Sequence, residues 1–185
     1  MAFLDAGEII QLFIITLALG YIFSGFIKRN NNDLFSFKNF SWKNIFFAAL
    51  IATPAVVLHE FGHKFVAMAF GFAASFHVFW TGLFLGVLLK VIGSPFLFLA
   101  PAYVSFSAEA SALQSALIAF AGPGVNFLLW GISALVLKYK QNMPENTLFA
   151  WSLSKRLNFL FFWFNLIPLP PLDGWTVLQG IIGMF

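Results

Sequence analysis

Residues 59–63 read HEFGH and place two histidines and a glutamate within five positions. His59 and His63 are four positions apart, so on a helix they are offset by only ~40° around the axis and ~6 Å along it, and both imidazoles can reach one ion. Glu60 can then meet a water molecule on that ion. Zinc hydrolases use this spacing, with two imidazoles holding the metal and a carboxylate taking a proton from water. The motif therefore predicts one zinc ion per chain and requires a third ligand.

The third ligand should be another acid or histidine. Five of the seven acidic residues lie near segment ends or in connections, namely Asp5, Glu8, Asp33, Glu109 and Glu145. Asp173 differs because it follows NLIPLPPL, whose prolines forbid a regular helix, and broken backbone at membrane depth is tolerated where it lines a polar cavity. We predict Asp173 as the third ligand. Two alternatives remain: Asp173 could cap a final helix from Gly174, and His77 could be the ligand, although its aromatic neighbours indicate a packed residue.

The composition is that of a membrane protein. Of 185 residues, 61% are hydrophobic and 9% charged, against roughly a quarter charged in a soluble domain. The 27 phenylalanines are accepted by lipid without penalty. The basic residues are scattered at segment ends, which argues against a nucleic-acid partner, and the absence of cysteine leaves His, Asp and Glu as metal ligands. We therefore expect a multi-pass protein in the lipid bilayer of the cell membrane.

The apolar segments define the expected fold. Those that approach the length needed to cross a ~30 Å hydrocarbon core are residues 9–27, 45–70, 111–137 and 148–167. Residues 83–103 could also span, but Lys90, Gly93 and prolines at 95 and 101 favour a short helix between extended segments. The predicted class is an all-α polytopic membrane protein, a bundle of about four to six transmembrane helices forming one domain over residues 1–185.

Smaller features refine this expectation. We expect a kink at Pro54, a break in the helix at AGPGVNF (121–127), and a final short helix over 174–185. The basic residues concentrate in the polar connection 28–44 and in 138–156. If 83–103 does not span, both regions lie on one face of the membrane, and the charge rule makes that face cytoplasmic.

Three motifs together resemble the site-2 proteases, which are intramembrane zinc metalloproteases. They are HEFGH at 59–63, AGPGVN at 121–126 and NLIPLPPLDG at 165–174. The resemblance implies that His59, His63 and Asp173 bind zinc and that Glu60 is the general base and acid. It also implies that Asn126 helps to hold the substrate or its oxyanion, and that Asn165 and Pro168 shape the site around Asp173.

The resemblance also implies an extended, membrane-associated β-hairpin after the HEFGH helix, at about residues 72–80, which could pair with an unwound substrate strand. Relatives run the motif helix toward the cytoplasm, opposite to the charge count. The chain looks like a short form without a PDZ or CBS domain. For Asn126 a simpler interpretation is open: its amide could replace backbone donors lost beside Gly122, Pro123 and Gly124.

The expected function is an endopeptidase that cuts a transmembrane or membrane-adjacent segment of another membrane protein, in regulated intramembrane proteolysis. A transporter or ion channel that uses His59, Glu60 and Asp173 as an ion relay is the alternative from a different class. A catalytically inactive relative that binds membrane helices is disfavoured, because all three expected ligands and the glutamate are present.

Overall fold

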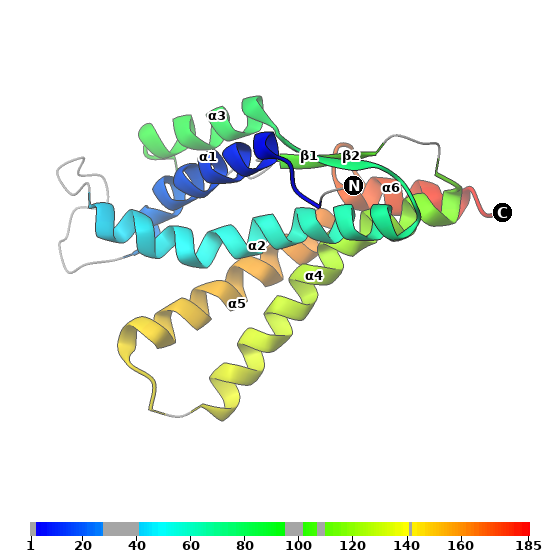
Figure 1. The fold of residues 1–185 in the computed structure, drawn as a ribbon. Helices are drawn as coiled ribbons and strands as arrows, with labels where there is room; N and C mark the ends of the chain where they lie inside the picture. Colours follow the sequence, from blue (N-terminus) through cyan, green and yellow to red (C-terminus); the bar gives the residue numbers. More distant parts are fainter. Residues whose placement is uncertain (1–2, 28–40, 95–101, 107–109, 141) are drawn as a thin grey trace. The chain divides into compact units, whose positions relative to one another are not determined.

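The computed structural model describes residues 3–27, 41–94, 102–106, 110–140 and 142–185. Over these residues the chain is mostly helical, as predicted, with a small two-stranded sheet (Figure 1). The helices are α1 (Ala6–Phe23), α2 (Trp42–Ala69), α3 (Trp80–Val91), α4 (Ala112–Tyr139), α5 (Glu145–Asn165) and α6 (Asp173–Ile182). The remaining elements are a 3-10 helix, η1 (Ser24–Phe26), and the strands β1 (Ala74–Val78) and β2 (Ala102–Phe106).

Three of the described helices, α1, α2 and α4, are long and apolar enough to cross a membrane. They cover most of the expected segments 9–27, 45–70 and 111–137. Helix α5 covers most of 148–167 but is less apolar, because Lys155, Arg156 and Asn158 lie in its middle. The long expected segments are therefore helical, and α5 stands apart from the others in its polarity.

A continuous helix over 83–103 is not formed. Helix α3 ends at Val91, and Gly93 follows with a φ of +68°, a left-handed conformation that glycine adopts readily. The alternative of a short helix between extended segments is confirmed, since β1 precedes α3 and β2 begins at Ala102. The prolines at 95 and 101 and most of the connection 28–44 lie outside the described residues.

Contacts divide the chain into two compact units. The first comprises Met1–Thr53 and Phe76–Tyr103, and the second comprises Pro54–Ser75 and Val104–Phe185. Helix α2 and both strands contribute residues to each unit. Our prediction of a single membrane domain stays a prediction.

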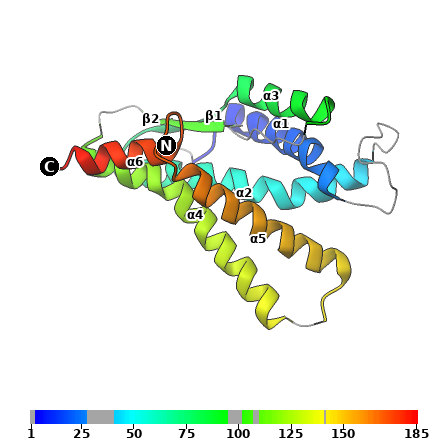
Figure 2. The same cartoon turned by 180° about the vertical axis from the view of Figure 1, so that it is seen from behind.

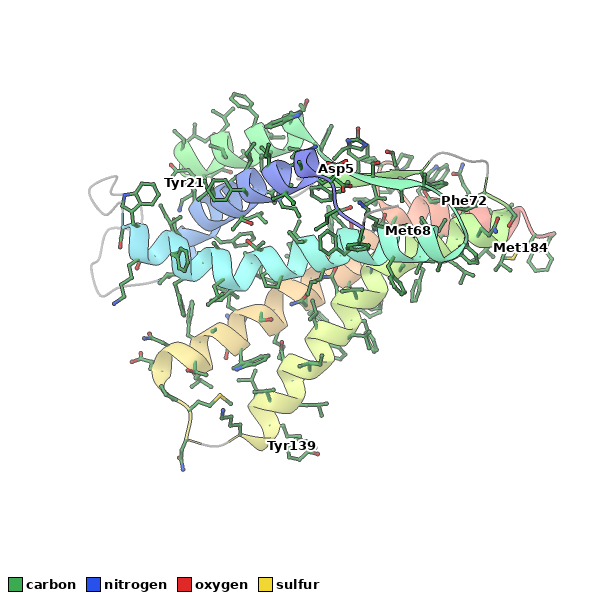
Figure 3. The ribbon with its side chains drawn as sticks, in the orientation of Figure 1. Asp5, Tyr21, Met68, Phe72, Tyr139 and Met184 are labelled. Carbon is green, nitrogen blue, oxygen red and sulfur yellow. The ribbon has the colours of Figure 1, made fainter. Side chains whose placement is uncertain are left out.

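In the first unit, α1 holds strand β1 through side chains. Asp5, labelled in Figure 3, precedes α1 and forms a capping box, in which Glu8 Oε2 accepts a hydrogen bond of 2.9 Å from the Asp5 backbone N–H. The other Glu8 oxygen, Oε1, accepts from the Phe76 backbone N–H at 2.6 Å, and Gln11 Oε1 accepts from the Val78 N–H at 2.7 Å. The N–H groups of β1 at these two positions are therefore already engaged by α1.

The sheet differs from the hairpin that we expected over residues 72–80. Strand β1 forms there, but it pairs antiparallel with β2, and α3 separates the two strands in sequence. The partner strand comes from a distant segment because the residues that follow β1 begin a helix at Trp80. A substrate strand that added to this sheet could not use the N–H groups of Phe76 and Val78.

In the second unit, α4 and α5 form an antiparallel pair, and α6 lies along the first part of α4 (Figures 1 and 2). Small residues allow these close approaches. A Cβ on Gly180 of α6 would lie 2.5 Å from the Ala112 carbonyl oxygen, and one on Gly62 of α2 would lie 2.8 Å from the Ala121 oxygen. The glycines thus bring α6 and the second half of α2 against α4.

The helix break that we expected at 121–127 is wrong. Helix α4 runs without interruption from Ala112 to Tyr139 with Pro123 inside it, and α2 likewise runs through Pro54. A proline removes only its own N–H and one helical hydrogen bond, which a long helix with many other contacts can tolerate. Gly122 and Asn126 therefore lie on one continuous helix, one turn apart.

Replacing Glu8 by alanine should lower the free energy of unfolding by about 1–3 kcal/mol, because two backbone N–H groups lose a charged acceptor. Amide hydrogen exchange at Phe76 should become faster, since its N–H is the one released from Glu8 Oε1. The matched control is Glu145→Ala, which removes an exposed acid from the first turn of α5 and should change stability by no more than about 0.5 kcal/mol. Equal losses in the two variants would show that the contact with β1 contributes nothing.

Candidate metal centre

His59, His63 and Asp173 converge in the second unit, and one ligand atom from each lies within 4.8 Å of the others. The two histidine Nε2 atoms are 3.1 Å apart. Asp173 Oδ2 lies 3.1 Å from His59 Nε2 and 3.4 Å from His63 Nε2. Both histidines are buried, and the Asp173 side chain is largely buried. The structure thus brings together the three residues that the sequence indicated as metal ligands.

The far side of each imidazole is fixed by a hydrogen bond to α4. His63 Nδ1 donates to the Ile118 carbonyl oxygen at 2.7 Å, because a carbonyl can only accept. His59 Nδ1 lies 2.6 Å from Asn126 Oδ1. The Asn126 amide cannot be turned over, since its Nδ2 donates to the Ala55 carbonyl oxygen at 2.8 Å. Both Nδ1 atoms therefore carry hydrogen, and both Nε2 atoms present lone pairs to each other.

Two nitrogen lone pairs and a carboxylate oxygen at such short distances repel one another unless a positive charge lies among them. A tetrahedral zinc ion with bonds of about 2.0–2.1 Å holds its ligands roughly 3.3 Å apart, which matches the separations of 3.1–3.4 Å found here. The donor set fits zinc.

Gly122 leaves the space that an ion needs. A Cβ built on this residue would lie 2.6 Å from His59 Nε2 and even closer to His63 Nε2, so it would occupy the position between the two nitrogens. Ile118, Gly122 and Asn126 follow one another at intervals of four and share one face of α4. This face supplies the acceptor for His63, the space for the ion and the acceptor for His59.

Asp173 is held by the turn between α5 and α6. The segment 166–172 has no regular helix, as its three prolines predicted. A Cβ on Gly174 would collide with the Leu166 backbone and lie 2.7 Å from the Ile167 oxygen, so the start of α6 packs directly on this turn. The N-cap of α6 is Leu172, without a side-chain hydrogen bond, whereas the Asp173 carboxylate reaches the histidines. Asp173 is therefore not the N-cap of α6, in contrast to the capping alternative.

The other predicted site residues lie in different settings. Glu60 is buried, and its carboxylate interacts electrostatically with His59, His63 and Asp173. His77 belongs to β1 in the first unit and has its ring 5.4 Å from the ring of Tyr103, and it is not a member of the metal-ligand group found among the described residues.

Two further residues that the resemblance placed around Asp173 make no contact with it that the structure identifies. Asn165 Nδ2 donates to the Phe161 carbonyl oxygen of its own helix at 3.1 Å. Pro168 lies exposed in the irregular turn. Their predicted role in shaping the site stays a prediction.

The contacts of Asn126 favour a different role from the one that we expected. Its side chain is fully buried, its Oδ1 faces His59, and its Nδ2 donates to Ala55 and to Asn158 Oδ1, the latter at 2.9 Å. Both amide hydrogens are thus in use, which leaves none for a substrate oxyanion, and neither repairs the backbone of α4. The arrangement suits the orientation of His59.

Sequence reasoning overlooked Asn158, a buried residue of α5 that contacts Asn126. The signal was present, because an asparagine in a predicted membrane span is costly unless it has partners. Gly62 was also overlooked, although a small residue between two metal ligands is a sign of close helix packing.

Known proteins provide an independent comparison. The chain is 31% identical over 176 residues to the "putative zinc metalloprotease" MJ0611 of Methanocaldococcus jannaschii, a match that covers 93% of this chain and 83% of that protein. Two proteins with the same description match over shorter parts. YwhC of Bacillus subtilis is 35% identical over 78 residues, covering 38% of this chain and 36% of its own. The protein sll0528 of Synechocystis is 30% identical over 136 residues, covering 72% of this chain and 31% of its own.

No family model and no solved structure matches the chain. The match to the archaeal protein nevertheless extends over 93% of this chain. The shared description and the donor set agree on zinc as the cofactor. The chain belongs to the zinc metalloprotease family of these relatives.

Proposed function

We propose that this protein is an intramembrane zinc metalloprotease of the site-2 type, which hydrolyses peptide bonds within or next to transmembrane segments of other membrane proteins. One observation carries the proposal: two of the three metal-ligand residues lie on α2, a helix long and apolar enough to cross a membrane. A peptidase that acts on soluble substrates has no need to place its metal ligands on such a helix.

The position of the ligands along α2 supports a site at membrane depth. His59 follows the first helical residue, Trp42, by 17 positions, which is about 25 Å along a helix and within the reach of a ~30 Å hydrocarbon core. Phe46, Leu50 and Phe65 of the same helix are exposed, and lipid is a favourable surrounding for such side chains. The proposed location is therefore the lipid bilayer, with a transmembrane protein as the substrate.

The residues of the centre have separate roles in this proposal. His59, His63 and Asp173 would hold the zinc, which would supply Lewis-acid activation of water near neutral pH and of a peptide carbonyl. The Glu60 carboxylate takes the proton from the attacking water and delivers it to the peptide nitrogen as the C–N bond breaks. Asn126 keeps the His59 ring in the orientation that presents Nε2.

Replacing Glu60 by glutamine should leave zinc bound and lower cleavage of a transmembrane reporter by about 10²- to 10⁴-fold, because the proton acceptor is lost while the ligands remain. Zinc content and cleavage are both measured on purified protein in detergent or in vesicles. An ion relay would give the opposite pattern, with ion flux across vesicles in the parent and no cleavage. A parent protein that contains zinc and cuts neither a transmembrane nor a membrane-adjacent segment would refute the proposed function.

Replacing Asp173 by alanine should weaken zinc binding, because one of three ligands is removed from the group. The comparison is His77→Ala, which removes the rival ligand and should leave the zinc content at one ion per chain. Elemental analysis of the freshly purified variants checks both expectations. If Asp173→Ala kept its zinc and His77→Ala lost it, the ligand assignment would pass to His77.

Replacing Gly122 by alanine should abolish stoichiometric zinc binding, since the new methyl group would lie between the two Nε2 atoms. Gly124→Ala is the matched control on the same helix, because its Cβ would meet only the Phe120 ring at an ordinary 3.6 Å. The control should keep its zinc and gain about 0.5–1 kcal/mol of stability from the better helix former. Normal zinc content in Gly122→Ala would show that the ion occupies another position.

A further inference from the structure

Asn158 joins α5 to the metal centre through a buried hydrogen bond. Its Nδ2 donates to the Ser154 carbonyl oxygen at 2.8 Å and lies 3.2 Å from Ser154 Oγ. Because the carbonyl can only accept, the amide group of Asn158 has one orientation, with Oδ1 as the atom that faces Asn126. Asn158 Oδ1 then accepts from Asn126 Nδ2 at 2.9 Å. The side chain of Asn158 is 1% exposed, so water does not compete for these contacts.

This contact constrains Asn126 and, through it, His59. If the Asn126 amide were turned over, its oxygen would face two other oxygens, those of Ala55 and Asn158, and its N–H groups would face the N–H of His59. Each of these contacts would be repulsive in a buried site. Asn158 and Ala55 therefore act together to keep Asn126 Oδ1 directed at His59 Nδ1.

The hydrogen bonds also run in one direction. His59 donates to Asn126, Asn126 donates to Asn158, and Asn158 donates to Ser154. Consecutive bonds of the same sense polarise one another, and an acceptor behind a metal-bound imidazole raises the basicity of the nitrogen that binds the metal.

We propose that Asn158 is a positioning residue for the metal centre: it fixes the amide of Asn126 and thereby the tautomer in which His59 presents Nε2 to zinc. The inference rests on the proposed role of His59 as a zinc ligand. Ser154 supports Asn158, and Ser133 extends the same network, with its Oγ 3.2 Å from Ser154 Oγ.

A double-mutant cycle tests whether Asn158 acts through Asn126. Zinc affinity is measured by competition with a chromophoric chelator for the parent, Asn158→Leu, Asn126→Leu and the double variant. Outer contacts to a metal ligand contribute about 10- to 100-fold in affinity, so Asn126→Leu should lose about that much. Asn158 is one contact further from His59 than Asn126 is. Its replacement by leucine should therefore lower the zinc affinity by about 3- to 10-fold in the parent, but by less than about 2-fold in the Asn126→Leu background.

A second readout and a packing control distinguish a role in positioning Asn126 from a general loss of packing or stability. The visible absorption of the cobalt(II)-loaded protein reports ligand geometry and should change in Asn158→Leu. Phe161→Leu removes volume from another buried residue of α5 and should leave both the cobalt spectrum and the zinc affinity unchanged. If Asn158→Leu does not fold, Asn158→Ser replaces it, since a serine there could donate to the Ser154 carbonyl as Ser133 does to that of Leu129 at 2.8 Å.

Equal losses of zinc affinity in the two backgrounds, or no loss in the parent background, would overturn the inference. Because zinc affinity is measured separately from cleavage, the experiment tests the role of Asn158 independently of the proposed function. A parent that binds zinc but cuts no transmembrane reporter refutes the protease proposal and leaves the role of Asn158 standing. A parent that binds no zinc at all overturns both.

Discussion

The hydrogen bond that holds the ring of His59 from behind is the contact on which the rest of the metal centre depends. Asn126 Oδ1 accepts it, and the corresponding bond for His63 ends on the Ile118 carbonyl oxygen. These two bonds direct both Nε2 atoms toward the same point, where the ion would lie. Because the rings are ordered by the fold, little conformational entropy remains to be lost when a metal binds.

Helix α4 provides this order from one face. Ile118, Gly122 and Asn126 are spaced at intervals of four, and the face they share lies against the HEFGH part of α2 in the second unit. The approach is close because Gly62 has no side chain to separate α2 from Ala121. Helix packing and metal geometry are therefore set by the same few small residues, and a change at either glycine would affect both.

The residues of the metal-ligand group could be predicted from the sequence better than their surroundings. Helical spacing and a proline-broken segment were enough to select His59, His63 and Asp173, because both arguments are local. The partner of β1 could not be predicted, since it lies beyond an intervening helix. Gly122 was interpreted as part of a break, although a helix tolerates one proline. The role of Asn126 was also beyond sequence reasoning, because an amide can donate or accept and only its neighbours decide which atom faces the histidine.

The chemistry of the three ligand atoms has a consequence for metal selectivity. Two imidazole nitrogens and one carboxylate oxygen suit zinc and its first-row neighbours, whereas calcium prefers about six to eight oxygen ligands. The same donors give no such protection against copper(II), which binds nitrogen and oxygen donors more strongly than zinc does. The donor set therefore disfavours the large oxygen-seeking ions, while the choice among first-row transition metals falls to the supply of each ion in the cell.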